Sequence, residues 1–296
     1  MLSRIVLQIM KNLRLFLTIF VMFIFIQPAH AIKIGLITGV ESVRLGASTY
    51  ANIINSRTNH KIYTLDPMRN YEFKAYGTKI TIKIAGKYYN LDSDEVAIRP
   101  TNGGFVSAKN RWYRGIFIVK NINGSLVLIN KLDIESYLRG VVPSEMPSSW
   151  DYEALKAQAI AARSYALANL GKRAKWGYDL KDTPEDQAYT GASGEKDSTD
   201  KAVADSYGIV LIYDLKIIPA YYSASAGGQS KTWERDLPYI RSVPSYDGNV
   251  KKNGHGVGMS QHGANNLAKQ GYNAYQILQY FYKNIRFAKI NQSYYQ

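Results

Sequence analysis

The sequence predicts an α+β protein, with a β-rich N-terminal module at residues 32–130 and a mixed α/β core at residues 131–296 built around an alanine-rich buried helix. Apolar and polar residues alternate over much of the first half, as they do in half-buried strands. Helical patterns begin after a change of composition near Lys131. Hydrophobic residues make up 46% of the 296-residue chain, which excludes a disordered chain and is enough to bury a core.

Residues 1–31 have the pattern of a signal peptide. Three basic residues precede or flank the start of the apolar run 15–26, and Ala29-His30-Ala31 fits a cleavage site. The run is shorter than the about 20 apolar residues that a spanning helix needs. We therefore expect export to the periplasm or cell wall, with an uncleaved membrane anchor as the alternative.

The net charge of the chain limits the classes of partner that it is expected to bind. Lys and Arg total 37 and Asp and Glu total 23, a formal charge of +14; removing the leader with its three basic and no acidic residues leaves 265 residues at +11. For an exported protein we exclude nucleic acid as a partner. The charge either faces an anionic envelope polymer or lipid surface, or serves solubility alone. Because no second apolar stretch reaches spanning length, we expect at most peripheral membrane contact.

Cysteine is absent from the chain. Its absence excludes a disulfide scaffold, Cys-ligated zinc, iron–sulfur clusters and a thiol nucleophile.

In the N-terminal module we expect a strand from Ile32, a strand over 78–84, and a hairpin whose strands, 114–119 and 125–129, flank Asn123-Gly124. None of these segments has catalytic spacing, so we expect a small antiparallel module.

In the core, residues 153–170 contain seven alanines and end before Gly171, which predicts a helix. Asp151 or Ser148 can cap its start. Four residues of one helix face have small or apolar side chains that allow close packing: Leu155, Ala159, Ala162 and Ala166. Further along the chain we expect four elements: a short helix around 202–204, a hairpin of 209–213 with 217–223, and helices at 264–269 and 273–282.

Glu145 is a lone carboxylate between Pro143 and Pro147 in an apolar run, where we expect a rigid loop. An apolar setting raises a carboxyl pKa, as a general acid at neutral pH requires. The alternative is an ordinary loop glutamate that is solvated or paired with Arg139 or Arg163. The residues alone favour this alternative.

Residues 253–263 hold four glycines around His255 and His262, so backbone N–H groups can approach a ligand closely. The segment has neither a G-x-S-x-G elbow around Ser260 nor an H-E-x-x-H zinc motif. The residues by themselves favour a structural role for both histidines.

Five segments, taken in this order, closely resemble the SpoIID/LytB family of sporulation lytic transglycosylases and amidase-enhancer proteins of bacterial walls. They are GVVPSEMPSSWDYEALKAQAIAARSYAL, DQAYTG, YYSASAGGQS, LPYIRSVPSYD and GHGVGMSQHGA. The resemblance covers roughly residues 130–284, about half of the chain.

The resemblance implies that Glu145 is the catalytic glutamate of an exported lytic transglycosylase that cleaves the MurNAc–GlcNAc bond of peptidoglycan glycan strands and leaves 1,6-anhydro-MurNAc. For this chain we expect no cofactor and no metal. Trp150 would be a candidate for stacking on sugar faces, as would Tyr189. The residues that the family motifs place along the glycan groove are Arg163, Gln187, Tyr189, Ser223, Ser225, His255 and Gln261.

The chain departs from the family in two ways. Some members hold a metal with cysteines and a histidine in the loop that matches 178–189, and this chain has no cysteine. Typical members also carry a longer insertion where six residues separate Asp247 from Gly254 here.

Two other functions stay open. The first is a non-catalytic peptidoglycan-binding enhancer of an N-acetylmuramoyl-L-alanine amidase, whose partner would be that cell-wall amidase. The second is an envelope adaptor that uses the β-rich module to bind a protein.

Overall fold

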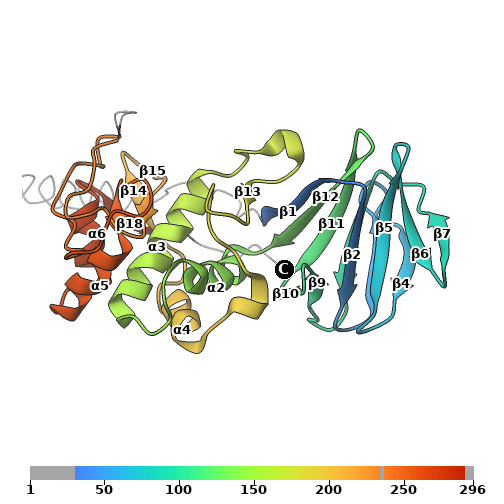
Figure 1. Cartoon of the computed structure of the whole chain (residues 1–296), viewed down its shortest axis with the longest axis horizontal. Helices are drawn as coiled ribbons and strands as arrows, with labels where there is room; N and C mark the ends of the chain where they lie inside the picture. Colours follow the sequence, from blue (N-terminus) through green and yellow to red (C-terminus); the bar gives the residue numbers. More distant parts are fainter. Residues whose placement is uncertain (1–30, 234–236, 291–296) are drawn as a thin grey trace, which may run out of the picture. The chain divides into compact units, whose positions relative to one another are not determined.

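The alternating pattern of the first half folds into two sheets (Figure 1), and the computed structural model describes residues 31–233 and 237–290. The larger sheet has the order β13-β1-β12-β11-β8-β3-β4 and the smaller has the order β10-β9-β2-β5-β6-β7. All their pairings are antiparallel except β1 with β13. The strands are β1 (Ile32–Val40), β2 (Ser42–Ala47), β3 (Ala51–Asn55), β4 (Lys61–Leu65), β5 (Asn70–Tyr76), β6 (Lys79–Ile84), β7 (Lys87–Asn90), β8 (Glu95–Pro100), β9 (Val106–Ala108), β10 (Arg111–Tyr113), β11 (Ile116–Ile122), β12 (Ser125–Leu132) and β13 (Leu180–Lys181).

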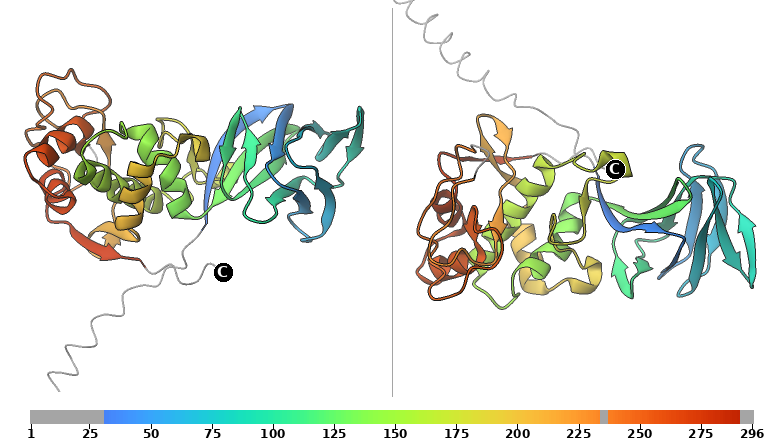
Figure 2. Two further views of the ribbon diagram at one scale, coloured as in Figure 1. Left: turned by 90° about the horizontal axis from the view of Figure 1, so that it is seen from below. Right: turned by 45° about the horizontal axis from the view of Figure 1, so that its top comes forward.

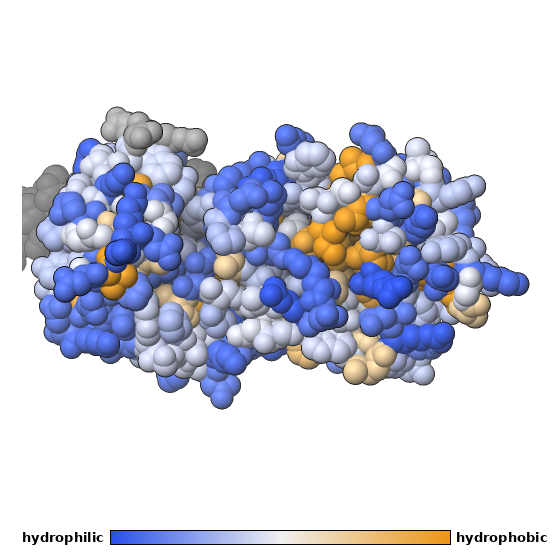
Figure 3. Space-filling view, in the orientation of Figure 1, coloured by the Kyte–Doolittle hydropathy of each residue, from blue (hydrophilic) through white to orange (hydrophobic). Residues whose placement is uncertain are grey.

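One apolar core is shared by the two sheets, whose strands are seen from two further sides in Figure 2. Ile53 and Phe117 of the larger sheet and Phe73 and Ile82 of the smaller one are fully buried in it. Alternate residues of a strand point to opposite faces, so one face of each sheet supplies this core. In the view of Figure 3 the main apolar surface patch lies over these strands, whereas the surface over the later helices is mainly hydrophilic.

The second half of the chain contains the helices, together with short strands. The helical segments are α2 (Ile134–Glu145), α3 (Tyr152–Ala168), η1 (Ala174–Trp176), η2 (Gly191–Gly194), α4 (Asp197–Asp205), α5 (Gln261–Lys269) and α6 (Ala274–Phe281). The strands are β14 (Ile209–Tyr213), β15 (Lys216–Ile217), β16 (Tyr222–Ser223), β17 (Met259–Ser260) and β18 (Arg286–Lys289).

The alanine-rich helix is confirmed as the buried helix α3. Asp151 caps its start and accepts a hydrogen bond from the N–H of Glu153 at 3.0 Å. Helices α2, α4, α5 and α6 and strand β14 all contact it. Small side chains on several faces allow this many close neighbours, because an alanine face lets another backbone approach. Its buried residues belong to two apolar cores, one shared with the sheets and one shared with α5 and α6.

The expectation of a rigid loop around Glu145 was wrong, because Glu145 is the last residue of helix α2. Asp133 caps α2 and accepts from the N–H of Ser136 at 2.9 Å. Pro143 lies inside the last turn. A proline there removes one N–H, and the helix ends within a turn of it at Met146. The two prolines therefore limit the helix instead of abolishing it.

The predicted hairpin after residue 209 forms only in part. β14 pairs with β15, but Tyr222 and Ser223 form β16, which pairs in parallel with β17. On its other side β14 pairs with β18. The chain thus leaves the hairpin after Ile217, and Tyr222 and Ser223 pair with a segment about 40 residues further along the chain.

The predicted α+β class with a β-rich N-terminal part is confirmed. Residues His30–Lys289 group into one compact unit, and the domain boundary expected near residue 131 stays a prediction. The leader expected at 1–31 lies outside the described residues, apart from Ala31. Within the ranges that the structure describes, no helix combines the length and the apolar character needed to cross a membrane.

Candidate functional site

Glu145 lies at the C-terminal end of α2 with its carboxylate held from two sides. Oε1 accepts a hydrogen bond from the backbone N–H of Ala188 at 2.7 Å, and Oε2 faces the side-chain amide of Gln261 at 3.4 Å. The side chain keeps part of its surface accessible. The carboxylate is therefore oriented by protein groups and still open to a ligand.

The surroundings of Glu145 favour its protonated form. Burial raises the pKa of the carboxyl, and hydrogen bonds from Ala188, Gln261 and Tyr222 lower it by less, so the net shift is upward. The negative end of the α2 dipole acts in the same direction as burial. A carboxyl group in this setting can give a proton at a pH where an exposed glutamate is ionised.

Gln187 is fully buried behind Glu145 and connects three elements. Its Oε1 accepts from the Tyr137 hydroxyl at 3.2 Å, and its Nε2 donates to the carbonyl of Ala162 at 3.2 Å and to the hydroxyl of Tyr222 at 2.9 Å. Because the Tyr222 oxygen accepts from Gln187, its proton is free to point toward Glu145. The structure thus brings Gln187 to the site through Tyr222, without exposing it.

Gln261 begins helix α5, immediately after its N-cap Ser260. The Ser260 hydroxyl accepts from the N–H of Gly263 at 3.1 Å, which is an ordinary capping interaction. The Ser260 hydroxyl also donates a hydrogen bond to the carboxylate of Asp247. Ser260 therefore fixes the start of the helix, and Gln261 is the sequence-predicted contact that the structure places directly against Glu145.

Arg163 is not accessible to a ligand. It is fully buried on α3, where its Nε and one terminal nitrogen bind both carboxylate oxygens of Glu135 at 2.8 and 2.6 Å. Its other donors reach the carbonyls of Ile209 and Val203. The bidentate buried pair ties α3 to α2, and the other donors tie α3 to α4 and to the start of β14. Its observed contacts are structural and do not include Glu145.

Tyr189 is also buried, with 1% of its surface exposed. Its hydroxyl donates to Asn130 at 2.8 Å, and its ring packs on Tyr137 with centroids 4.9 Å apart. Gly140 makes this possible, since a Cβ at that position would lie 2.6 Å from the Tyr189 ring. The ring is therefore not accessible for stacking on a sugar.

Ser223 and Ser225 directly precede the glycine-rich turn at Ala226, Gly227 and Gly228, and both are buried. The Ser225 hydroxyl donates to the carbonyl of Lys251 at 2.6 Å. The Ser223 hydroxyl has no hydrogen-bond partner among the residues described. Gly254 passes directly beside it with φ of +94°, and a Cβ there would lie 2.9 Å from the Ser223 Cβ, so this position requires glycine.

His255 packs its ring edge-on against Tyr221 and Trp233 at 6.1 and 5.8 Å. Its Nδ1 accepts from the N–H of Val257 at 2.9 Å. Burial lowers the pKa of the ring, and the positive charge of Lys252 adds to this effect. Part of the residue remains exposed, so His255 presents a neutral imidazole at the surface.

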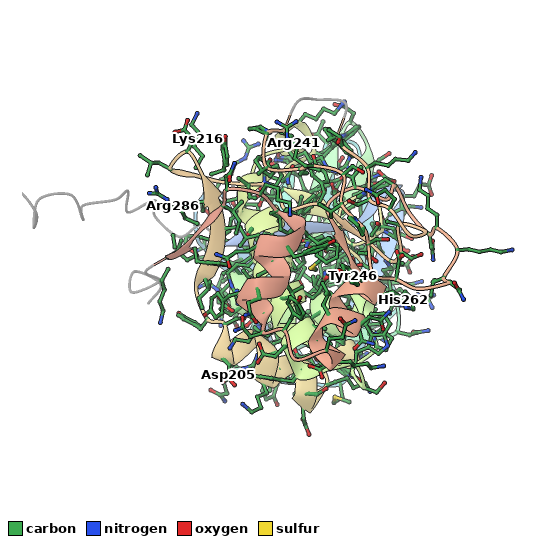
Figure 4. All side chains as sticks on the ribbon, turned by 90° about the vertical axis from the view of Figure 1, so that its left-hand side faces the viewer. Asp205, Lys216, Arg241, Tyr246, His262 and Arg286 are labelled. Atoms are coloured by element: carbon green, nitrogen blue, oxygen red, sulfur yellow. The ribbon has the colours of Figure 1, made fainter. Side chains whose placement is uncertain are left out.

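Trp150 and His262 form an edge-to-face pair with ring centroids 4.7 Å apart. Both side chains are half-buried. In Figure 4, His262 and Tyr246 lie on the same side of the second half of the chain, and Tyr246 is 44% exposed. Trp150 thus keeps accessible ring surface, unlike Tyr189.

Asp247 is a residue whose importance the sequence did not reveal. Its buried carboxylate accepts from the N–H groups of Ala226, Gly227 and Gly228 and from the hydroxyls of Ser245 and Ser260. Burial alone would raise the pKa, but these hydrogen bonds outweigh it and lower the pKa of Asp247. The carboxylate holds the glycine-rich turn to the start of α5.

Tyr222 and the backbone N–H of Ala188 were also missed as site groups. Both lie inside quoted family segments, next to residues that were singled out. A signal for Tyr222 is its position directly before Ser223, but nothing in the sequence shows which tyrosine turns toward the carboxylate. No three His, Asp or Glu side chains gather as a metal site within residues 31–233 and 237–290.

The segment that carries this geometry matches a known family model. The model described as SpoIID, stage II sporulation protein, matches residues 122–213, which include α2, α3 and the segment around Gln187. This match confirms the resemblance to the SpoIID family that the sequence predicts.

Three relatives illustrate how similar this chain is to other proteins and how much of each protein is matched. An uncharacterized protein of Brachyspira hyodysenteriae is 31% identical over 202 residues, 61% of this chain and 54% of that protein. The amidase enhancer of Bacillus subtilis is 31% identical over 215 residues, 68% of this chain and 30% of the enhancer. The stage II sporulation protein D of Bacillus subtilis is 31% identical over 183 residues, 55% of this chain and 52% of that protein. The matched regions thus span about half or less of each relative, and the names support a role connected with the cell wall.

Proposed function

We propose that this chain is an exported lytic transglycosylase that cleaves MurNAc–GlcNAc glycan strands of peptidoglycan. The observation that carries the proposal is the single oriented carboxyl of Glu145, whose pKa is raised by burial. Among the described residues, the groups placed against it are an N–H, an amide and a phenol, and none is a carboxylate. Glycosidases that use water need a second carboxylate as nucleophile or base.

One carboxyl is enough when the sugar supplies its own nucleophile. Protonated Glu145 gives its proton to the glycosidic oxygen as the bond from C1 to that oxygen breaks, which leaves an oxocarbenium-like sugar and a carboxylate. The 6-hydroxyl of the same MurNAc attacks C1, and the carboxylate takes its proton. The products are a 1,6-anhydro-MurNAc end and a free GlcNAc end, with no water consumed and Glu145 protonated again.

The other groups orient this proton. Ala188 and Gln261 hold the two carboxylate oxygens, and Tyr222 is fixed by Gln187 on the side of Glu145. Trp150 supplies half-buried aromatic surface for a sugar face. The basic chain suits a polymer whose lactyl-linked groups are acidic.

A second function is favoured by one comparison. The relative named amidase enhancer matches 68% of this chain, so binding of peptidoglycan with stimulation of a cell-wall amidase is the alternative proposal. Export through the leader at 1–31 is part of both proposals.

The test is to incubate purified glycan strands with the protein and with Glu145→Gln, and to identify products by mass spectrometry. The proposal expects anhydro-disaccharides or anhydro-muropeptides from the first and none from the second, while both fold alike. Glu41→Gln, at a side chain 86% exposed, is the matched control and should keep full activity.

Full activity of Glu145→Gln would overturn the mechanism. Wall binding without anhydro products, together with a faster amidase on mixing, would favour the enhancer.

A further inference from the structure

The outer face of β5, β6 and β7 carries a polar row across three strands. Lys74 pairs with Thr81, and Thr81 pairs with Asn90, so the three side chains lie side by side on one face. The opposite face holds Phe73 and Ile82, which are fully buried in the core. Because successive residues of a strand alternate between faces, the polar row points away from the core.

Two exposed tyrosines flank this row. Tyr76 is 71% exposed and Tyr88 is 46% exposed. Between them lies a shallow depression of about 370 Å³, lined by Lys74, Ala75, Tyr76, Thr81, Tyr88 and Asn90. Exposed aromatic side chains around polar groups are typical of binding surfaces, because the ring offers apolar area and the hydroxyl a hydrogen bond.

The same face has an excess of positive charge. The strand pairings place Arg44, Lys74, Lys79 and Lys83 on it, against the carboxylate of Glu72. The Lys83 ammonium lies over the Tyr88 ring, 5.3 Å from its centroid. Lys74 also lies 3.9 Å from Glu41, an exposed and weak pair. β7 is the edge strand of the sheet (Figure 1), and all of its residues are exposed.

We propose that this face, defined by Lys74, Tyr76, Lys79, Lys83, Tyr88 and Asn90, is a second binding surface that takes an acidic polysaccharide. Tyrosine rings stack on the apolar faces of sugar rings, the exposed amide of Asn90 donates to sugar hydroxyls, and the lysines meet carboxylates. The flanking tyrosines belong to rows four strand positions apart, about 13 Å along the sheet, so a chain of sugars fits better than a single ring. A lipid surface fits less well, because no large aliphatic side chain lines the depression.

That the acidic polysaccharide is peptidoglycan rests on the proposed function. Glu145 is not part of this surface, so cleavage and this attachment can be lost separately. A second point of attachment raises the effective concentration of substrate at the catalytic glutamate without adding a contact there.

The experiment measures co-sedimentation of the full chain with insoluble peptidoglycan freed of other wall polymers. Tyr76→Ala with Tyr88→Ala should weaken binding about tenfold, the expected effect of losing two stacking rings. Lys79→Gln with Lys83→Gln should weaken it further at low salt and less at high salt, because exposed charges are screened. The matched controls are Tyr50→Ala with Tyr272→Ala and Lys216→Gln with Lys289→Gln, all at exposed positions elsewhere, and both should bind as the unchanged protein does.

Unchanged binding by the tyrosine pair and by the lysine pair would overturn the proposal. Normal wall binding combined with loss of binding to vesicles rich in anionic lipid would overturn it in favour of a lipid surface. Circular dichroism shows whether the tyrosine double variant is folded. If it is misfolded, the wall binding of the lysine double variant tests the proposal.

A short soluble glycan separates this proposal from the proposed function. The tyrosine pair should cleave such a fragment at the normal rate, and Glu145→Gln should sediment normally while cleaving nothing. If Glu145→Gln cleaves normally but the tyrosine pair fails to sediment, the proposed function fails and the binding surface stands.

Discussion

The side-chain amide of Gln261, the first residue of α5, lies 3.4 Å from the carboxylate of Glu145, the last residue of α2. The two residues are 116 positions apart in the chain. This contact joins the C-terminal end of α2 to the N-terminal end of α5. The protonation of Glu145 therefore depends on the side chain at position 261. A change at position 261 should therefore be read out in the pH dependence of the reaction.

Replacing Gln261 with glutamate should raise the pKa of Glu145, because two nearby carboxyl groups cannot both ionise easily. Cleavage needs protonated Glu145, so activity is present below its pKa in the folded protein and falls as the pH rises through it. Gln261→Glu should move this fall to higher pH by about one unit or more. Rates of anhydro-product release across pH check it, with Gln229→Glu, at an exposed position, as the control. A profile identical to that of the unchanged protein would contradict the contact.

Tyr222→Phe should remove the hydroxyl between Gln187 and Glu145 while keeping the ring. We expect a loss of turnover of about 10 to 100-fold, less than the about 10²–10⁴-fold typical of the group that itself transfers the proton, because Tyr222 only positions Glu145. The pKa of Glu145 should also rise, since the Tyr222 hydroxyl lowers it. Tyr221→Phe, at the neighbouring tyrosine, should keep its turnover. Steady-state rates and thermal melts of both variants decide whether the hydroxyl matters.

Arg163→Met should destabilise the fold by about 3 to 5 kcal/mol, because it leaves the charge of buried Glu135 without its bidentate partner. Urea unfolding measures the free energy. Arg241→Ala, at an exposed arginine shown in Figure 4, should change it by no more than about 0.5 kcal/mol. If Arg163→Met is as stable as the protein itself and only binds glycan less well, the arginine acts at the groove after all.

Asp247→Ala should cost about 3 kcal/mol or more of stability, since five donors would lose a buried charged acceptor. The folded pKa of Asp247 is lowered. Its stabilising effect is therefore fully present above the pKa of about 3.9 of an unfolded aspartate and is lost as the pH falls through the folded value. Urea unfolding between pH 7 and pH 3 should show a smaller acid-induced loss of stability in the variant. An equal loss in both proteins would exclude this role.

The sequence predicted the fold class, the capped helix α3 and the resemblance to the SpoIID family, because these depend on local pattern. The cap by Asp151 and the alternation in β6 are decided within a few residues. The surroundings of Glu145 could not be predicted in this way. Gln187, Tyr222 and Gln261 reach it through long-range packing, and a motif gives no sign of which side chain turns inward.

The same limit explains why the structure buries residues that were expected to line the groove, Arg163 and Tyr189 among them. Arg163 and Tyr189 lie in segments that also contain site residues, and motif membership does not separate a ligand contact from the support behind it. Glu135 and Asn130, which bind their polar ends, are ordinary residues in the sequence. Burial of a polar side chain depends on such partners.

An insertion or deletion within helix α2 would change the direction in which the side chain of Glu145 points. Each residue added to a helix turns everything after it by about 100° around the axis. Between the cap at Asp133 and Glu145, one extra residue would swing the carboxyl away from Ala188 and Gln261, even with every side chain of the site intact. The phase of this helix is therefore as much a part of the chemistry as the glutamate at its end.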